Sequence, residues 1–145
     1  MYEKVLVAVD LSDETEKVVE RAFELVDSQV DKLMLVHVVQ PVPQVWGMES
    51  YTLDPAELQQ RIVDSAGELL RTLGAERGIN ADNLYTLLGS PASEVRDMAK
   101  RLNADAIVIG SHGHSGWKLM LGSTATKLLH GATCDVLTVF VGEED

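Results

Sequence analysis

Short apolar runs, separated by longer stretches with helical periodicity, most restrict how this chain of 145 residues can fold. The runs occupy residues 4–9, 32–39, 84–88, 106–109 and 135–141. Most of them are continuously apolar rather than alternating, which is typical of strands covered on both faces in a parallel sheet. Strands that alternate with helices predict βαβ units, here within one domain that spans residues 1–145.

Four helices are expected between these strands. The first is predicted to begin with a capping box formed by Asp13 and Glu16. The second is predicted to begin with Asp54 as its cap and Pro55 at the first helical position. Its expected apolar stripe toward the core consists of Leu58, Ile62, Ala66, Leu69 and Leu73.

The remaining helix boundaries complete an α/β pattern. The second helix is expected to end at Gly74 or Gly78, Ser90 is expected to cap the third helix, and the fourth covers residues 125–130. The expected architecture is a Rossmann-like, doubly wound, five-stranded parallel sheet with strand order 3-2-1-4-5. In such sheets ligands bind at the carboxyl ends of the strands, where the order reverses.

A glycine-rich stretch follows the fourth strand and leads into the fourth helix. Topology brings its first residue, Gly110, to the same crevice as Asp10, which leaves the first strand. Glycines let backbone N–H groups turn toward an anion, and the helix start adds further donors, with Ser123 and Thr124 positioned to cap the helix or contact phosphate. A glycine-rich turn capped by serine is the structural alternative, and Asp10 is either a ribose or metal ligand or a turn residue.

Composition narrows the classes of partner and compartment. The net charge of −11 makes nucleic acid and anionic membrane surfaces unlikely partners. Cys134 is the single cysteine, so no intramolecular disulfide can form. The chain enters a strand pattern at once without a signal-peptide pattern, and no apolar run approaches the roughly 20 residues of a membrane span. The cytoplasm is the expected location.

Several short motifs together point to a known family. They are Val7-Ala8-Val9-Asp10-Leu11-Ser12, His37-Val38, Gly89-Ser90-Pro91, Gly110-Ser111-His112-Gly113, Gly122-Ser123-Thr124 and the ending from Cys134 to Val139. In this combination the chain resembles the universal stress protein family, specifically its ATP-binding branch, over essentially its whole length. That family's nucleotide signature has nine residues between the second and third glycines, whereas eight residues separate Gly113 from Gly122 here.

The resemblance implies a ligand and a set of contacts. It implies ATP, with Mg or Mn, bound with its ribose at Asp10 and with its adenine edge read by the backbone of Val38. The implied triphosphate cradle consists of Gly110, Ser111, His112, Gly113, Gly122, Ser123 and Thr124. His112 is either a base, a phosphate donor or a solvated loop residue, and His37 is interpreted as a residue of the core or strand end.

The resemblance also implies a homodimer joined through the last strand. An independent argument agrees, because the run that begins at Val136 and ends at Val141 forms an apolar sheet edge, and such edges are usually paired or blocked. The irregular segment 40–53 is either a lid, a surface for an unknown protein partner, or a plain surface excursion.

These patterns favour a nucleotide-binding stress or regulatory protein whose occupancy modulates dimer or partner contacts. Two alternatives remain open: a slow ATP hydrolase and a nucleotide-independent dimeric interaction protein. The hydrolase is ranked lower because the lysine that a P-loop places directly before its Ser or Thr is replaced by Gly122. No catalytic residue is therefore assigned.

Overall fold

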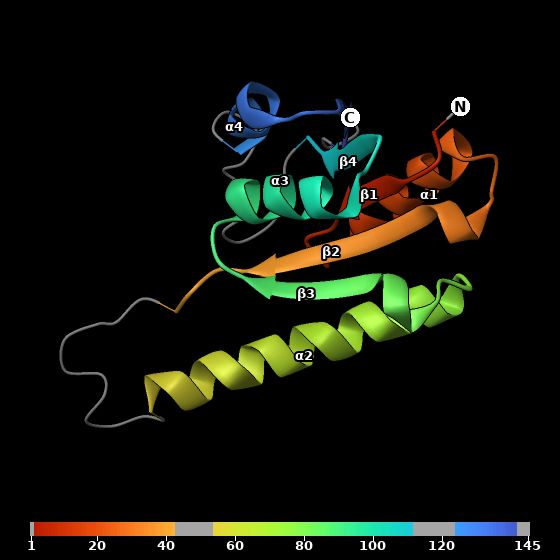
Figure 1. The fold of residues 1–145 in the computed structure, drawn as a ribbon. Helices are drawn as coiled ribbons and strands as arrows, with labels where there is room; N and C mark the ends of the chain where they lie inside the picture. Colours follow the sequence, from red (N-terminus) through yellow and green to blue (C-terminus); the bar gives the residue numbers. More distant parts are fainter. Residues whose placement is uncertain (1, 43–53, 112–123, 142–145) are drawn as a thin grey trace.

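The computed structural model describes residues 2–42, 54–111 and 124–141, with the side chains of 124–126 and 129 left out. Its centre is one sheet in which all paired strands run parallel, in the order β3-β2-β1-β4-β5 (Figure 1). The strands are β1 (Val5–Ala8), β2 (Leu33–Val39), β3 (Leu84–Leu88), β4 (Ala106–Gly110) and β5 (Asp135–Val139). The predicted α/β class and strand order are confirmed.

Helices fill the connections between the strands. They are α1 (Thr15–Leu25), α2 (Pro55–Glu76), α3 (Pro91–Leu102) and the shorter α4 (Thr124–Gly131). Single turns of 3₁₀ helix, η1 (Val30–Lys32) and η3 (Ala81–Asn83), precede β2 and β3. Because right-handed crossovers reverse direction after β3, α1 and α2 cover one face of the sheet and α3 and α4 cover the other.

The two-sided cover explains the continuous apolar runs. In β1, Val5 and Val7 pack with α1 and α2, whereas Leu6 and Ala8 pack with α3 and α4. All four side chains are buried, because successive residues of a strand point to opposite faces and both faces are covered here.

The start of α1 differs from the prediction, because Asp13 does not cap the helix. The N-cap residue is Glu14, which makes no side-chain capping bond, and Asp13 is exposed. Ser12 closes this turn instead: its hydroxyl accepts the Glu14 N–H (3.2 Å) and its carbonyl accepts the Thr15 N–H (3.1 Å). Ser12, one position before Asp13, therefore supplies the acceptors that the capping-box pattern assigned to Asp13.

The other predicted helix ends agree with the structure in position. Asp54 and Ser90 are the N-cap residues of α2 and α3, although neither side chain makes a capping hydrogen bond. The end of α2 is set by Gly78, whose φ of +74° favours glycine. Gly74 lies inside the helix, and its carbonyl accepts the Ile79 N–H at 2.8 Å.

The apolar stripe predicted on α2 is only partly buried. Ala66 is buried, as is Leu70, which lies beside the predicted stripe. The exposed members are Leu58 at 36%, Ile62 at 38% and Leu69 at 58% exposure. For Leu58 and Ile62 the reason is length: 22 helical residues span about 33 Å, whereas the five residues of neighbouring β3 span only about 17 Å (Figure 1). The amino-terminal part of α2 therefore extends beyond the sheet.

Candidate functional site

The candidate site lies at the carboxyl edge of the sheet, where β1 and β4 are neighbours. Their register pairs Ala8 with Ile109, so Gly110 lies level with Val9, one residue before Asp10. β1 connects toward β2 and β4 toward β5, so the strand order reverses between them. The predicted switch point in the strand order is therefore present, with a carboxylate and the first glycine of the loop beside it.

The Asp10 carboxylate is held by the turn that follows it. Asp10 Oδ1 accepts the Ser12 N–H (3.0 Å), the Ser12 hydroxyl (2.6 Å) and the Thr15 hydroxyl (3.2 Å). Leu11, between these residues, has a φ of +62°, which is uncommon for a residue with a β-carbon. Asp10 is thus a turn residue in this structure, and the turn fixes where its carboxylate stands.

His37 lies on β2 next to this turn. Its Nδ1 is 2.8 Å from the carbonyl oxygen of Val9, and because a carbonyl only accepts, Nδ1 carries the proton. Burial lowers the pKa of His37 below its ordinary value, against smaller opposing effects of the Val9 bond and Asp10. Burial therefore favours the neutral imidazole, and the bond to Val9 defines its tautomer at the edge of the candidate site.

Val38 lies on a step in the carboxyl edge of the sheet, where β2 extends past the end of β1. The last β1–β2 pair is Ala8 with Val36, whereas β2 stays paired with β3 up to Val39 and Leu88. β2 therefore continues for three residues past its pairing with β1. Val36 directs its carbonyl to β1, where it accepts the Val9 N–H at 2.9 Å. By the two-residue period of a strand, the backbone groups of Val38 point to this side as well.

Ser111 is tied to β5. Its N–H donates to the Val139 carbonyl (2.7 Å), and its hydroxyl oxygen accepts the Val141 N–H (3.0 Å). The side chain is buried, with 6% exposure. Its backbone N–H is thus used in the sheet, and the contact of Ser111 that the structure describes is with the end of β5.

The structure brings together four of the predicted site residues: Asp10, Val38, Gly110 and Ser111. Thr124 is the first residue of α4, and its side chain is outside the described part. The other predicted contacts also lie outside the described residues; they are His112, Gly113, Gly122 and Ser123.

A hollow that the sequence interpretation missed adjoins this edge. It has a volume of about 370 Å³ and lies between α2 and the ends of β1 and β2. Its lining includes Leu11, His37 and Arg61 together with Ile62 and Leu69, two of the exposed α2 residues. The sequence signal for such a surface was the apolar stripe predicted on α2, which is longer than the neighbouring five-residue strand β3 can cover.

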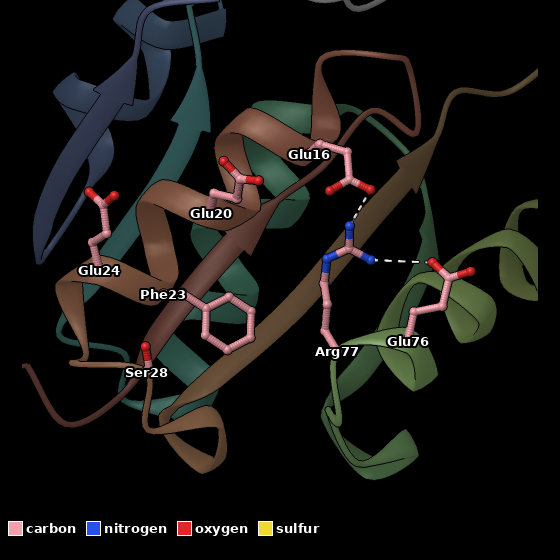
Figure 2. A pocket seen from close by; sticks show the side chains of 7 residues that line it. All are labelled: Glu16, Glu20, Phe23, Glu24, Ser28, Glu76 and Arg77. Atoms are coloured by element: carbon pink, nitrogen blue, oxygen red, sulfur yellow. Dashed lines mark hydrogen bonds and ion pairs between the residues drawn. The ribbon is translucent and has the colours of Figure 1, made fainter.

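A larger hollow of about 530 Å³, between α1 and the end of α2, has a different character (Figure 2). Arg77, which follows the last residue of α2, reaches across it and pairs with Glu16 of α1 and with Glu76 at the end of α2, at 3.5 Å in the latter case. The hydrogen bond from Arg77 lowers the pKa of the Glu16 carboxyl. The arginine therefore links the start of α1 to the end of α2 on this face of the sheet.

Within residues 2–42, 54–111 and 124–141, no three His, Cys, Asp or Glu side chains are grouped so that they could hold a metal ion. None of the helices in the described part is both long enough and apolar enough to cross a membrane.

Known proteins resemble the chain along nearly its full length. The profile of the Universal stress protein family matches residues 1–139. Universal stress protein A homolog 1 of Coxiella burnetii is 37% identical over 142 residues, covering 98% of this chain and 99% of the relative.

Solved structures share the fold. The structure of hypothetical protein MJ0577 has a TM-score of 0.78 at 22% identity and covers 99% of each chain. A universal stress protein solved in complex with cAMP has a TM-score of 0.58 at 22% identity, covering 95% of this chain and 97% of the other. The match to the family profile and the relative with 37% identity both span almost the whole sequence. The chain belongs to the universal stress protein family.

Proposed function

We propose that this protein binds an adenine nucleotide, ATP with Mg or Mn, at the carboxyl edge between β1 and β4. The observation that carries the proposal is the convergence of Asp10, Val38 and Gly110 on that edge from three adjacent strands. The family membership supports it, as does a fold relative solved in complex with cAMP, which also contains adenine.

The step in the sheet suits an adenine ring. In this reading the base lies beside Val38, whose backbone groups are directed toward the side on which β1 has ended. Backbone N–H and C=O groups recognise the donor and acceptor pattern of a base edge without a charged side chain. The ribose then lies toward Asp10, whose orientation is set by its bonds to Ser12 and Thr15.

The phosphates are assigned to the glycine loop and to the start of α4. Gly110 ends β4, and Thr124 begins α4, so the stretch between them connects a buried strand to a helix amino terminus. The first amides of a helix lack intrahelical acceptors and favour anions. The cradle of this proposal consists of Gly110, Ser111, His112, Gly113, Gly122, Ser123 and Thr124.

Nucleotide occupancy is proposed to regulate assembly rather than to fuel rapid turnover. β5 ends the sheet on one side, and Ser111 joins its carboxyl end directly to the beginning of the loop. The backbones of Val139 and Val141 face β4, so those of Thr138 and Phe140 face the open edge. A second copy pairing along this edge would form the homodimer. An unknown protein partner is proposed to respond to the bound nucleotide as well.

The test is a calorimetric titration of nucleotide-free protein with Mg-ATP. We expect saturable binding, and at 100 times the dissociation constant we expect about 2.7 kcal/mol of added stability. Gly113→Val should abolish binding, because a β-branched side chain obstructs the approach of phosphate and resists positive φ.

Asp10→Asn should weaken binding by only about 1 kcal/mol, because it removes one ribose hydrogen bond while an oxygen remains for Ser12 and Thr15. Gly67→Ala on α2 is the matched control, since an added β-carbon there meets only ordinary contacts of 3.6 Å or more. The proposal fails if wild-type protein shows no binding of Mg-ATP.

A further inference from the structure

A third hollow lies on the other face of the sheet, between α3 and α4. Its volume is about 510 Å³. Its polar lining comes from Ser90 and Ser93 on α3 and from Arg96, Lys127 and His130 on the two helices. No Asp or Glu is among the described residues that line it, although the chain as a whole carries a net charge of −11. A hollow lined by basic side chains attracts anions locally, although the net negative charge of the protein repels them.

Arg96 is held in place at this hollow by α4. Its Nη1 donates to the Lys127 carbonyl at 3.1 Å. A β-carbon built on Gly131 would come within 2.7 Å of Arg96 Nε, so the guanidinium lies close against the backbone at the end of α4. The arginine uses one donor in this bond, and a guanidinium has five, so it can still donate to an anion. Its position requires little reordering on binding.

The start of α3 adds backbone donors to the same hollow. Glu94 is the first residue of α3 whose N–H reaches a carbonyl of the helix, that of Ser90 at 2.9 Å. The amides of Ala92 and Ser93 precede it and lack such an acceptor within the helix. The N-cap residue, Ser90, makes no side-chain capping bond. Hydroxyls, helix amides and basic side chains from two helices therefore converge on one volume.

We propose that the α3–α4 hollow is a binding site for a phosphate monoester, distinct from the nucleotide cradle and independent of the nucleotide proposal. The arginine fork and the two serine hydroxyls match the oxygens of a phosphate dianion. A water molecule occupies about 30 Å³ in the liquid, and a phosphate group is only a few times larger. The hollow of about 510 Å³ therefore has room for the organic part of an ester as well.

The test is a titration of isotope-labelled protein at fixed pH and ionic strength, first with inorganic phosphate and then with ribose 5-phosphate. We expect saturable changes in the amide resonances of Ser93 and Arg96. Lys127→Gln should weaken binding roughly fivefold, the effect of an exposed ion pair of about 1 kcal/mol. Lys100→Gln, on an exposed residue in the last turn of α3, is the control for net charge and should leave affinity unchanged.

The variants separate this site from the cradle. Gly113→Val, which removes ATP binding under the nucleotide proposal, should leave the phosphate titration unchanged. Stronger binding of ribose 5-phosphate than of inorganic phosphate supports a phosphate monoester as the ligand. Stronger binding of inorganic phosphate would identify the free ion as the ligand and overturn the assignment to a monoester.

The site itself is refuted if neither ligand gives saturable shifts, if Lys100→Gln weakens binding as much as Lys127→Gln, or if Gly113→Val abolishes it. Absence of ATP binding in the calorimetric test would leave this result untouched.

Discussion

Replacing Ser111 with alanine tests how the loop is joined to the edge strand. In the structure the Ser111 hydroxyl accepts the N–H of Val141, and both residues are buried, at 6% and 0% exposure. Alanine removes the acceptor and leaves that N–H buried without it. The substitution leaves the Ser111 N–H, which donates to Val139, in place.

The size of the effect follows from desolvation. A buried donor that loses its partner costs about 1–3 kcal/mol, so we expect Ser111→Ala to reduce the free energy of unfolding by about 2 kcal/mol. For a domain of this length the melting temperature should fall by roughly 6–8 °C. The end of β5 should also exchange its amide hydrogens faster, because this bond fixes the strand beyond its last ladder pair, Gly110 with Val139.

Urea unfolding, followed by fluorescence at one protein concentration, measures the difference in free energy. Ser65→Ala is the matched control, because Ser65 is exposed on α2 and the same atoms are removed without burying a donor. A loss below about 0.5 kcal/mol in Ser111→Ala, the range of ordinary surface substitutions, would refute the structural role assigned to this hydroxyl.

Two further predictions concern the histidine at the site and the sheet edge. Burial lowers the pKa of His37 below 6.5, so the unfolded chain binds the proton first as pH falls, and the free energy of unfolding should decrease below about pH 6.5. This decrease should be smaller in His37→Gln. Identical pH profiles of the two proteins in urea unfolding would contradict this. Thr138→Pro removes an N–H that faces the open edge and should shift the light-scattering mass from dimer toward monomer. Exposed Thr72→Ala is the control, and an unchanged mass for Thr138→Pro would place the interface elsewhere.

Local patterns along the chain were sufficient to predict the sheet. Continuous apolar runs such as 4–9 require cover on both faces, and their alternation with helices leaves few ways to order the strands. From that order the meeting of Asp10 and Gly110 follows without any knowledge of side-chain contacts, and the structure agrees. These conclusions depend on hydrophobic burial and chain connectivity, which are written along the chain as periodic patterns.

The pairing of polar atoms, in contrast, depends on how segments distant in the sequence pack together. The capping pattern at Asp13 is local and plausible, yet Ser12 closes the turn because Asp10 Oδ1 holds it there. Ser111 belongs to a phosphate motif by sequence, whereas in the structure its hydroxyl bonds to Val141, 30 residues away. The basic hollow depends on Arg96 lying across the end of α4, which no helical period encodes. Such contacts join distant segments, so their partners are set by how the packed elements meet in space.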